Sequence, residues 1–133
     1  MIVLVKGIGV DLVHSPRVRH LLETMSEGGL ARMFTQEELA ASKKDPHPEE
    51  YLAARFAAKE AVFKALAHLT PEKTFDLRIV ETLNHEDGSP YIRIAESLDT
   101  VMHKAGVARL EVSITTERDY AAAFVVACDD ELT

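Results

Sequence analysis

Three charged residues have the types and spacing for chemistry on a phosphate. Asp11 follows Gly7-Ile8-Gly9-Val10 at the expected end of a strand, whereas Glu60 and Lys64 lie one helical turn apart. Two carboxylates suit Mg²⁺, which takes one or two protein carboxylates and completes its ligand shell with water and substrate phosphates. Lys64 is then placed to neutralise charge on such a phosphate. Together the three residues indicate metal-assisted chemistry at a phosphate.

Each of these residues also has a purely structural interpretation. Glu60 and Lys64 alone would be a surface ion pair worth about 0.3–0.5 kcal/mol. Asp11 alone would be a capping or turn aspartate. The Gly7-x-Gly9 pair lacks the third glycine of a dinucleotide-binding fingerprint, and it indicates instead a strand end that bends or approaches another group closely.

Two further features of the sequence involve basic residues. Lys59 falls within the apolar stripe of the predicted long helix, so it must extend to solvent, pair with a carboxylate or face a partner subunit. Arg17 and Arg19 make the first predicted helix locally basic in a chain of net charge −7. That basic patch is either an ordinary solvated face or a docking surface for an acidic partner.

The elements that must position these residues follow from capping, proline and periodicity signals. The expected helices cover residues 15–27 (Ser15 as cap, Gly28-Gly29 as stop), about 36–44 (a capping box at Thr35), 48–67, and about 98–105 (stopped by Gly106). The expected strands cover residues 2–10 (buried), 75–83, 91–94, 110–114 and 121–127, the last apolar on both faces and therefore central. Helices gathered early and strands late predict an α+β fold, in which an antiparallel sheet packs against a long buried helix.

Length and composition narrow the class of protein. The chain has 133 residues, 47% hydrophobic and 28% charged, which fits one globular domain over 1–133. Its negative charge argues against nucleic-acid binding. The longest apolar run, residues 120–128, is far shorter than the roughly 20 residues of a membrane helix. The lone Cys128 and the lack of a secretion leader lead us to expect a cytoplasmic protein.

Several motifs occur together along nearly the whole chain. They are Gly7-Ile8-Gly9-Val10-Asp11-Leu12, Arg17, Phe34-Thr35 with Glu38, the run Tyr51-Leu52-Ala53-Ala54-Arg55-Phe56-Ala57-Ala58-Lys59-Glu60-Ala61-Val62-Phe63-Lys64-Ala65, Gly88-Ser89-Pro90, Val112-Ser113-Ile114-Thr115 and Tyr120-Ala121-Ala122-Ala123. In this order they closely resemble holo-acyl-carrier-protein synthase, the small type of 4′-phosphopantetheinyl transferase. The alanine-framed arginine, lysine, glutamate and lysine of the long helix are the most specific part.

The resemblance implies a Mg²⁺-dependent transferase of fatty-acid biosynthesis. Such an enzyme moves the phosphopantetheine arm of coenzyme A onto a serine of apo acyl carrier protein and releases adenosine 3′,5′-bisphosphate. The resemblance further implies a homotrimer with each active site between neighbouring subunits, and the same phosphopantetheinyl transferase fold.

The resemblance also implies roles for individual residues. Asp11 and Glu60 would hold Mg²⁺, Lys64 would contact phosphate, and these three would be the catalytic residues, with Glu60 the candidate acceptor for the serine proton. The residues implied to bind the coenzyme are Arg55, Lys59, Lys64, Gly88, Pro90, Ser113 and Thr115. Arg17 and Arg19 would meet the acidic carrier protein.

The chain departs from the family pattern in two places. The family's glycine-threonine-glycine loop after the long helix is replaced by Ala67-His68-Leu69-Thr70-Pro71, and His68 or Lys73 is the hypothetical substitute for its phosphate contacts. Glu111 and Thr116 stand where the family has histidines. These departures support an alternative hypothesis, a catalytically weak relative that binds carrier protein or coenzyme A without efficient turnover.

Overall fold

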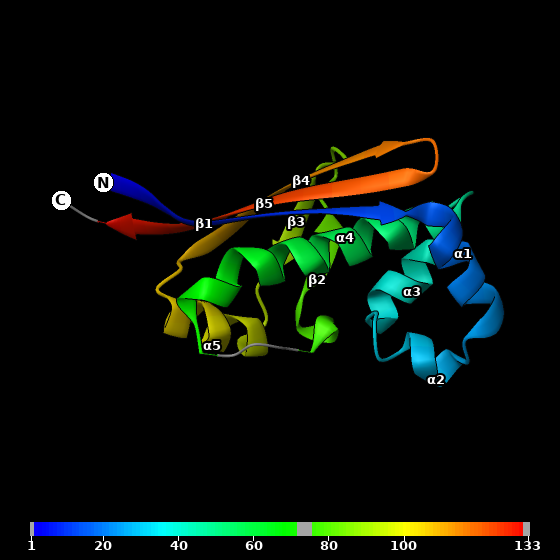
Figure 1. Cartoon of the computed structure of the whole chain (residues 1–133), viewed down its shortest axis with the longest axis horizontal. Helices are drawn as coiled ribbons and strands as arrows, with labels where there is room; N and C mark the ends of the chain where they lie inside the picture. The colour runs from blue at the N-terminus through cyan, green and yellow to red at the C-terminus, as the bar shows by residue number, and fades with distance from the viewer. Residues whose placement is uncertain (1, 72–75, 132–133) are drawn as a thin grey trace.

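A three-stranded antiparallel sheet runs along one long central helix in the computed structural model, which describes residues 2–71 and 76–131 (Figure 1). The strands β1 (Ile2–His14), β4 (Arg109–Glu117) and β5 (Tyr120–Glu131) lie in the order β1-β5-β4. The strand that is apolar on both faces, β5, is therefore central, as its sequence predicts. The α+β class and the antiparallel sheet are confirmed.

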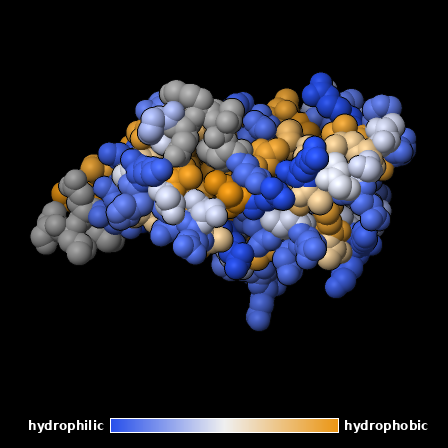
Figure 2. Space-filling model, turned by 90° about the horizontal axis from the view of Figure 1, so that it is seen from below, coloured by the Kyte–Doolittle hydropathy of each residue, from blue (hydrophilic) through white to orange (hydrophobic). Residues whose placement is uncertain are grey.

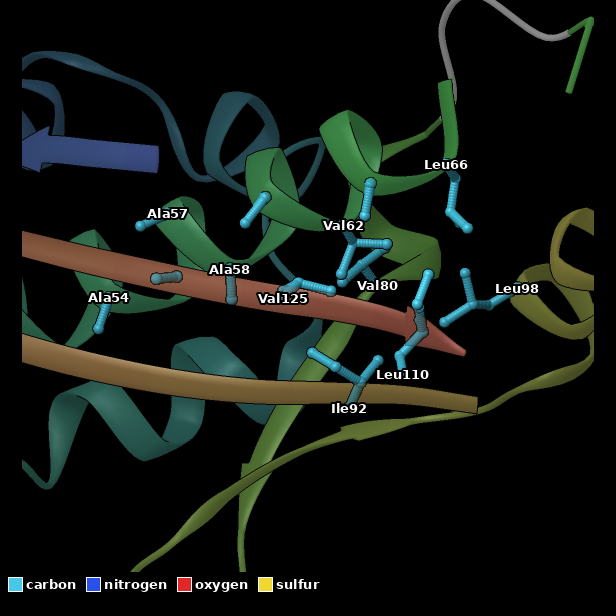
Figure 3. Close-up of a cluster of buried hydrophobic side chains, with 14 of the residues drawn as sticks. Ala54, Ala57, Ala58, Val62, Leu66, Val80, Ile92, Leu98, Leu110 and Val125 are labelled. Carbon is cyan, nitrogen blue, oxygen red and sulfur yellow. The ribbon is translucent and has the colours of Figure 1, made fainter. Parts of the chain in front are cut away.

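The helix α4 (Pro48–Leu66) is the core of the molecule. Proline in its first turn pre-sets the helical φ, and an uninterrupted alanine-rich sequence carries it over 19 residues, about 28 Å. Its alanines let neighbouring elements approach closely, and Figure 3 shows Ala54, Ala58 and Val62 among the apolar side chains gathered beside β5. The prediction of a long helix buried on several sides is confirmed, with its end one residue earlier than expected.

Two glycines set the distance between β1 and α4. A Cβ atom on Gly7 would lie 2.0 Å from the carbonyl oxygen of Ala65, and one on Gly9 would lie 1.8 Å from that of Ala61. Only glycine permits such contact between the strand and the helix backbone. Since strand residues two apart share a face, Asp11 points to the same side as Gly9, towards α4. The Gly7-x-Gly9 motif is thus a close-packing motif.

Three short helices cover the end of the sheet where β1 finishes: α1 (Ser15–Thr24), α2 (Glu27–Leu30) and α3 (Gln36–Lys43) (Figure 1). The predicted capping box at Thr35 is present, with Glu38 as its second member. The expected cap at Ser15 is wrong, because β1 runs directly into α1 and His14 holds the cap position without a side-chain hydrogen bond. Gly28 and Gly29 lie inside α2 rather than ending a helix.

The second half of the chain adds a hairpin and a helix. The strands β2 (Glu81–Asn84) and β3 (Pro90–Arg93) form a separate two-stranded sheet. The helix α5 (Glu96–Ala105) ends at Gly106 as predicted, and the φ of Gly106 is left-handed at 72°. The predicted strand over 75–83 is wrong for most of its length. Asp76 accepts a hydrogen bond from the Arg78 amide and starts the short 3-10 helix η2 (Leu77–Ile79), and Phe75 lies outside the described residues.

One face of the main sheet packs on α4, while the other is open and apolar. Ile8 and Val10 of β1 are both 57% exposed, and Phe124 of β5 is 44% exposed. The prediction that β1 is buried is therefore wrong for its outer face in the single chain. Polar residues dominate the face of the molecule away from the sheet, with smaller apolar patches between them (Figure 2). Within residues 2–71 and 76–131, no helix is long and apolar enough to cross a membrane.

Candidate active site

Asp11 and Glu60 line the same cavity, which has a volume of about 330 Å³. β1 supplies Asp11 and α4 supplies Glu60, and the Gly9 contact described above brings these two elements together. The walls are mostly apolar and come from β1, from the helices α1, α2 and α4, and from the turn before α3; they comprise Leu12, Val13, Val18, Leu21, Leu30, Met33, Phe34 and Phe56. The cavity therefore places two carboxylates against a hydrophobic wall.

Lys64 lies beside the first carboxylate. Its ammonium donates hydrogen bonds to Oδ1 of Asp11 at 3.0 Å and to the carbonyl oxygen of Val10 at 3.1 Å. The ion pair of Lys64 thus joins α4 to β1 and is not merely a contact along one helix surface. The lysine side chain is 52% exposed, whereas that of Asp11 is 17% exposed. An anion approaching from solvent can therefore reach the ammonium.

The second carboxylate has a perturbed proton affinity. Partial burial raises the pKa of Glu60 above its ordinary 4.5, the negative charge of Asp11 raises it further, and the positive charge of Lys64 opposes the shift. Both carboxylates line one cavity, so their negative charges repel each other. A cation between them would relieve that repulsion.

The donor set fits a hard divalent cation. Among the described residues, no group of three or more His, Cys, Asp or Glu side chains is placed to hold a metal. Mg²⁺ needs only one or two protein carboxylates, because water and substrate phosphates supply its remaining oxygen ligands. Asp11 and Glu60 are therefore the residues that would hold it, with Lys64 next to the substrate phosphates.

Only one of the two arginines on α1 reaches this cavity. Arg17 lines its rim, whereas Arg19 extends along the surface to Glu49 of α4, with a nitrogen-to-oxygen distance of 3.5 Å. The Arg19 side chain is 56% exposed, so the pair adds little stability. Both guanidinium groups remain on the accessible side of α1.

A second cavity, of about 310 Å³, gathers several of the residues expected to bind coenzyme. Arg55, Gly88 and Pro90 line it together with Thr116. Ser113 and Thr115 do not belong to it. They alternate with Ile114 and Thr116 on β4, so their side chains lie on the open face of the sheet.

Arg55 is held firmly in this second cavity. Its guanidinium lies 3.8 Å from the centroid of the Tyr51 ring and donates to Oδ1 of Asn84 at 3.1 Å. The residue is only 6% exposed, and within the described part of the chain its Nε has no acceptor. A buried, unsatisfied donor beside a cavity favours an anionic ligand.

Lys59 lies inside the fold. Its ammonium pairs with Oε1 of Glu38 at 2.8 Å, and both side chains are fully buried. Of the three interpretations given by the sequence, the structure shows pairing with a carboxylate. Burial lowers the pKa of Lys59, and the charge of Glu38 acts in the opposite direction. A coenzyme contact of Lys59 would require this pair to open.

The segment after α4 differs from the expected phosphate loop. It continues as a short 3-10 helix, η1 (Ala67–Leu69), and Nε2 of His68 lies 3.2 Å from the carbonyl oxygen of Lys6. His68 is exposed and lies beside Gly7, in the middle of β1. Lys73, the other suggested substitute, lies outside the described residues.

Sequence reasoning missed the residues that complete both cavities. Phe34 and Phe56 wall the first cavity, although Phe56 alone looks like an ordinary core residue of α4. Tyr51 and Asn84 orient Arg55 in the second. The four-residue spacing from Tyr51 to Arg55 places them on one helix face, and this signal could have indicated their contact. Nothing local to Asn84 points to its role.

The fold and the site place the chain in a known class. The family model described as the 4′-phosphopantetheinyl transferase superfamily matches residues 7–125, and the chain belongs to that family. It is 36% identical over 123 residues to the holo-[acyl-carrier-protein] synthase of Halothermothrix orenii, covering 92% of this chain and 97% of that protein. It is 37% identical to that of Thermodesulfovibrio yellowstonii, with coverage of 92% and 98%. The resemblance found in the sequence motifs is confirmed.

Solved structures give the same result. The synthase of Neisseria meningitidis superposes with a TM-score of 0.82 at 31% identity, covering 93% of this chain and 98% of that chain. The synthase of Bacillus anthracis in complex with coenzyme A (3′,5′-ADP) superposes with a TM-score of 0.74 at 25% identity, with coverage of 95% and 98%. The likeness extends over almost the whole of each chain.

Proposed function

We propose that this protein transfers the 4′-phosphopantetheine arm of coenzyme A to a serine of apo acyl carrier protein and releases adenosine 3′,5′-bisphosphate. The observation that carries the proposal is the meeting of Asp11 and Glu60 in one cavity, with the ammonium of Lys64 beside them. Phosphoryl transfer depends mainly on positioning and on neutralising charge, and these groups supply both.

Asp11 and Glu60 would hold Mg²⁺ in this cavity. When bound, the ion neutralises charge on the coenzyme diphosphate. Lys64 donates to a phosphate oxygen and stabilises the negative charge of the departing nucleotide as the serine oxygen bonds to phosphorus. Glu60 accepts the serine proton at a carboxylate oxygen.

The second cavity would bind another part of the coenzyme. Arg55 offers a buried donor to an anionic group, while Gly88 and Pro90 shape the wall beside it. The placement of Ser113 and Thr115 on the open sheet face is compatible with a coenzyme contact only where another subunit covers that face. Lys59 is the least accessible of the proposed coenzyme contacts, because its charge is paired inside the chain.

The acidic carrier protein would dock on α1. Arg17 lies at the rim of the cavity that holds the carboxylates, and Arg19 is exposed on the same helix. A chain of net charge −7 repels an acidic partner over most of its surface. A local basic patch therefore guides that partner to the catalytic cavity.

A homotrimer with sites between subunits accounts for two observations together. Arg55 and Lys64 are about two and a half turns apart on α4, so they face opposite sides and lie roughly 13 Å apart along the axis. A ligand that uses both groups at neighbouring positions would bind between two chains. The exposed apolar face of Ile8, Val10 and Phe124 offers the surface for such an assembly.

We place the reaction in the cytoplasm. Cys128, the single cysteine of the chain, is a buried free thiol, which suits a reducing compartment. The alternative of a catalytically weak relative has one observation in its favour: the short helix η1, which contains no glycine, follows α4 where the resemblance implies a glycine loop, so backbone groups there would approach a phosphate less closely.

The decisive experiment incubates the protein with apo carrier protein, coenzyme A and Mg²⁺ and weighs the carrier by mass spectrometry. Addition of the arm, lost with EDTA and in Glu60→Gln, supports the transferase. Binding of carrier or coenzyme in calorimetry without a mass gain would support the weak relative. Absence of both would reject the two hypotheses together.

A further inference from the structure

A buried ion pair links α3 to the middle of α4. Lys59 is the largest fully buried side chain of the chain's described part, and its ammonium lies 2.8 Å from Oε1 of Glu38. It also donates hydrogen bonds to the carbonyl oxygens of Leu77 and Val80. All three ammonium hydrogens therefore have acceptors, although no solvent reaches the group.

The Glu38 carboxylate holds more than the lysine. Oε1 accepts a hydrogen bond from the Thr35 amide at 3.0 Å, and Oε2 accepts one from the Thr82 amide at 3.3 Å. One carboxylate thus joins the start of α3, the middle of α4 and the strand β2. Two apolar side chains of the same size could pack α3 against α4, but they would leave these two amides without their acceptor.

The residues next to this pair form the catalytic cavity. Phe34 precedes Thr35, is 2% exposed and lines the cavity, and the ammonium of Lys59 lies 5.8 Å from the centroid of its ring. Glu60 follows Lys59 directly on α4 and lines the same cavity. The Glu38–Lys59 pair lies next to both Phe34 and Glu60 and therefore fixes the position of these two residues, although they come from different parts of the chain.

We propose that Glu38 is a positioning residue for the transfer reaction. It acts through Lys59 and the Thr35 amide to hold the Phe34 side chain at a fixed position relative to Glu60. The inference rests on the proposed function. Glu38 does not contact the substrate. It affects the reaction indirectly, because the acceptor serine must approach Glu60 inside the cavity that Phe34 lines. A displacement of about 1 Å at such a site lowers a rate by about a hundredfold.

The alternative is that the pair contributes only stability. Replacing a buried ion pair by neutral groups of similar volume is often harmless to stability, whereas removing one partner is strongly destabilising. The double variant Glu38→Gln with Lys59→Met therefore separates the two roles. It removes both charges, keeps the volumes and keeps an amide oxygen opposite Thr35, but the ammonium that connects Glu38 to α4 is gone.

The experiment compares thermal unfolding and steady-state transfer in the parent, in Glu38→Gln, in the double variant, and in Ser42→Ala. The last is the matched control, because Ser42 is a buried polar residue of α3 that bonds to the Leu39 carbonyl, outside the network. We expect the double variant to lose at least about tenfold in kcat. It should unfold below the parent temperature but above that of Glu38→Gln, because it leaves no unpaired charge although the carbonyl oxygens of Leu77 and Val80 lose their donor. The coenzyme KM is measured in Glu38→Gln, which keeps Lys59, and should stay within about twofold, because the Arg55 cavity lies elsewhere on α4.

The outcomes are separable. A double variant that folds and transfers at the parent rate overturns the positioning role, as does a loss of rate confined to the coenzyme KM. A double variant that fails to unfold cooperatively moves the test to Glu38→Asp, which keeps the charge but shortens the reach and must lower kcat in a folded chain. A parent chain with no transfer activity refutes the proposed function itself and, with it, this inference.

Discussion

The ammonium of Lys64 lies 3.0 Å from Oδ1 of Asp11, although the two residues are 53 positions apart in the chain. This contact closes β1 on α4 at the level of the carboxylate pair, and it puts a positive charge next to the residues that would bind Mg²⁺. Asp11, Glu60 and Lys64 thus meet because two elements pack together, and the following expectations test that packing and its chemistry.

Removing one carboxylate should stop transfer without unfolding the chain. Asp11→Asn and Glu60→Gln keep the side-chain shape but weaken cation binding, and Glu60→Gln also removes the proton acceptor, so we expect at least about a hundredfold loss of kcat. Mass spectrometry of the carrier gives the rate, and calorimetry with Mg²⁺ gives the affinity. Glu96→Gln, an exposed substitution on α5, is the control and should leave both values unchanged. Full activity of Glu60→Gln would exclude the assigned roles.

The raised pKa of Glu60 predicts how metal binding depends on pH. A glutamate with a raised pKa retains its proton at a higher pH than the ordinary 4.5, and the protonated form binds Mg²⁺ poorly. Mg²⁺ affinity should therefore fall as the pH drops through the raised pKa. Without metal the sign for stability is opposite: because the folded chain holds this proton more tightly, the free energy of unfolding should decrease as the pH rises through that window. Titration calorimetry measures the Mg²⁺ affinity and thermal unfolding measures the stability, each as a function of pH. Glu60→Gln is the control, because it lacks the titrating carboxylate and should not show the pH dependence that Glu60 causes.

Gly9→Ala should separate β1 from α4. The added Cβ would lie 1.8 Å from the Ala61 carbonyl oxygen, and the backbone has to move to accept it. We expect a loss of about 2 kcal/mol or more in the free energy of unfolding. Gly28→Ala is the matched control, because a Cβ there meets its nearest atom, Ser26 Oγ, at 3.9 Å. Equal unfolding midpoints in urea for the two variants would contradict the close-packing role.

Arg17→Glu should weaken docking of the carrier protein while coenzyme affinity is retained. The substitution reverses a charge at the cavity rim, so an acidic partner is repelled where it was attracted, and we expect the carrier KM to rise about tenfold or more. Lys43→Glu makes the same charge reversal at an exposed position of α3 and should change the KM little. Loss of coenzyme and carrier binding to the same extent would count against a docking role.

The open sheet face should control the oligomeric state. Phe124→Asp places a charge on the apolar face. Ile94→Asp is the control, because it places the same charge just after β3 at a residue with similar exposure (42%, against 44% for Phe124). Light scattering should give a trimer for the parent and for Ile94→Asp, and a smaller species for Phe124→Asp, because burying an unpaired charge is costly. A parent that stays monomeric at micromolar concentration would refute the shared-site arrangement.

The local signals in the sequence predicted much of this fold correctly. Proline at the start of α4 and its alanine-rich run, the capping box at Thr35 and the stop at Gly106 all depend on interactions within a few residues, so they can be read directly from the chain. The family motifs identified the class of enzyme for the same reason, since they are contiguous. The strand over 75–83 failed because Asp76 forms a local hydrogen bond that favours a 3-10 turn over extended backbone.

Only the tertiary structure decided which side chains contact each other and which face of the sheet each residue occupies. The sequence offered three environments for Lys59, and the packing of α3 on α4 selected Glu38. It left the meaning of Gly7-x-Gly9 open, and the approach of β1 to the α4 backbone settled it. It could not show that Ser113 and Thr115 face away from the Arg55 cavity. These outcomes depend on which distant elements come into contact, and periodicity within a single element contains no information about its neighbour.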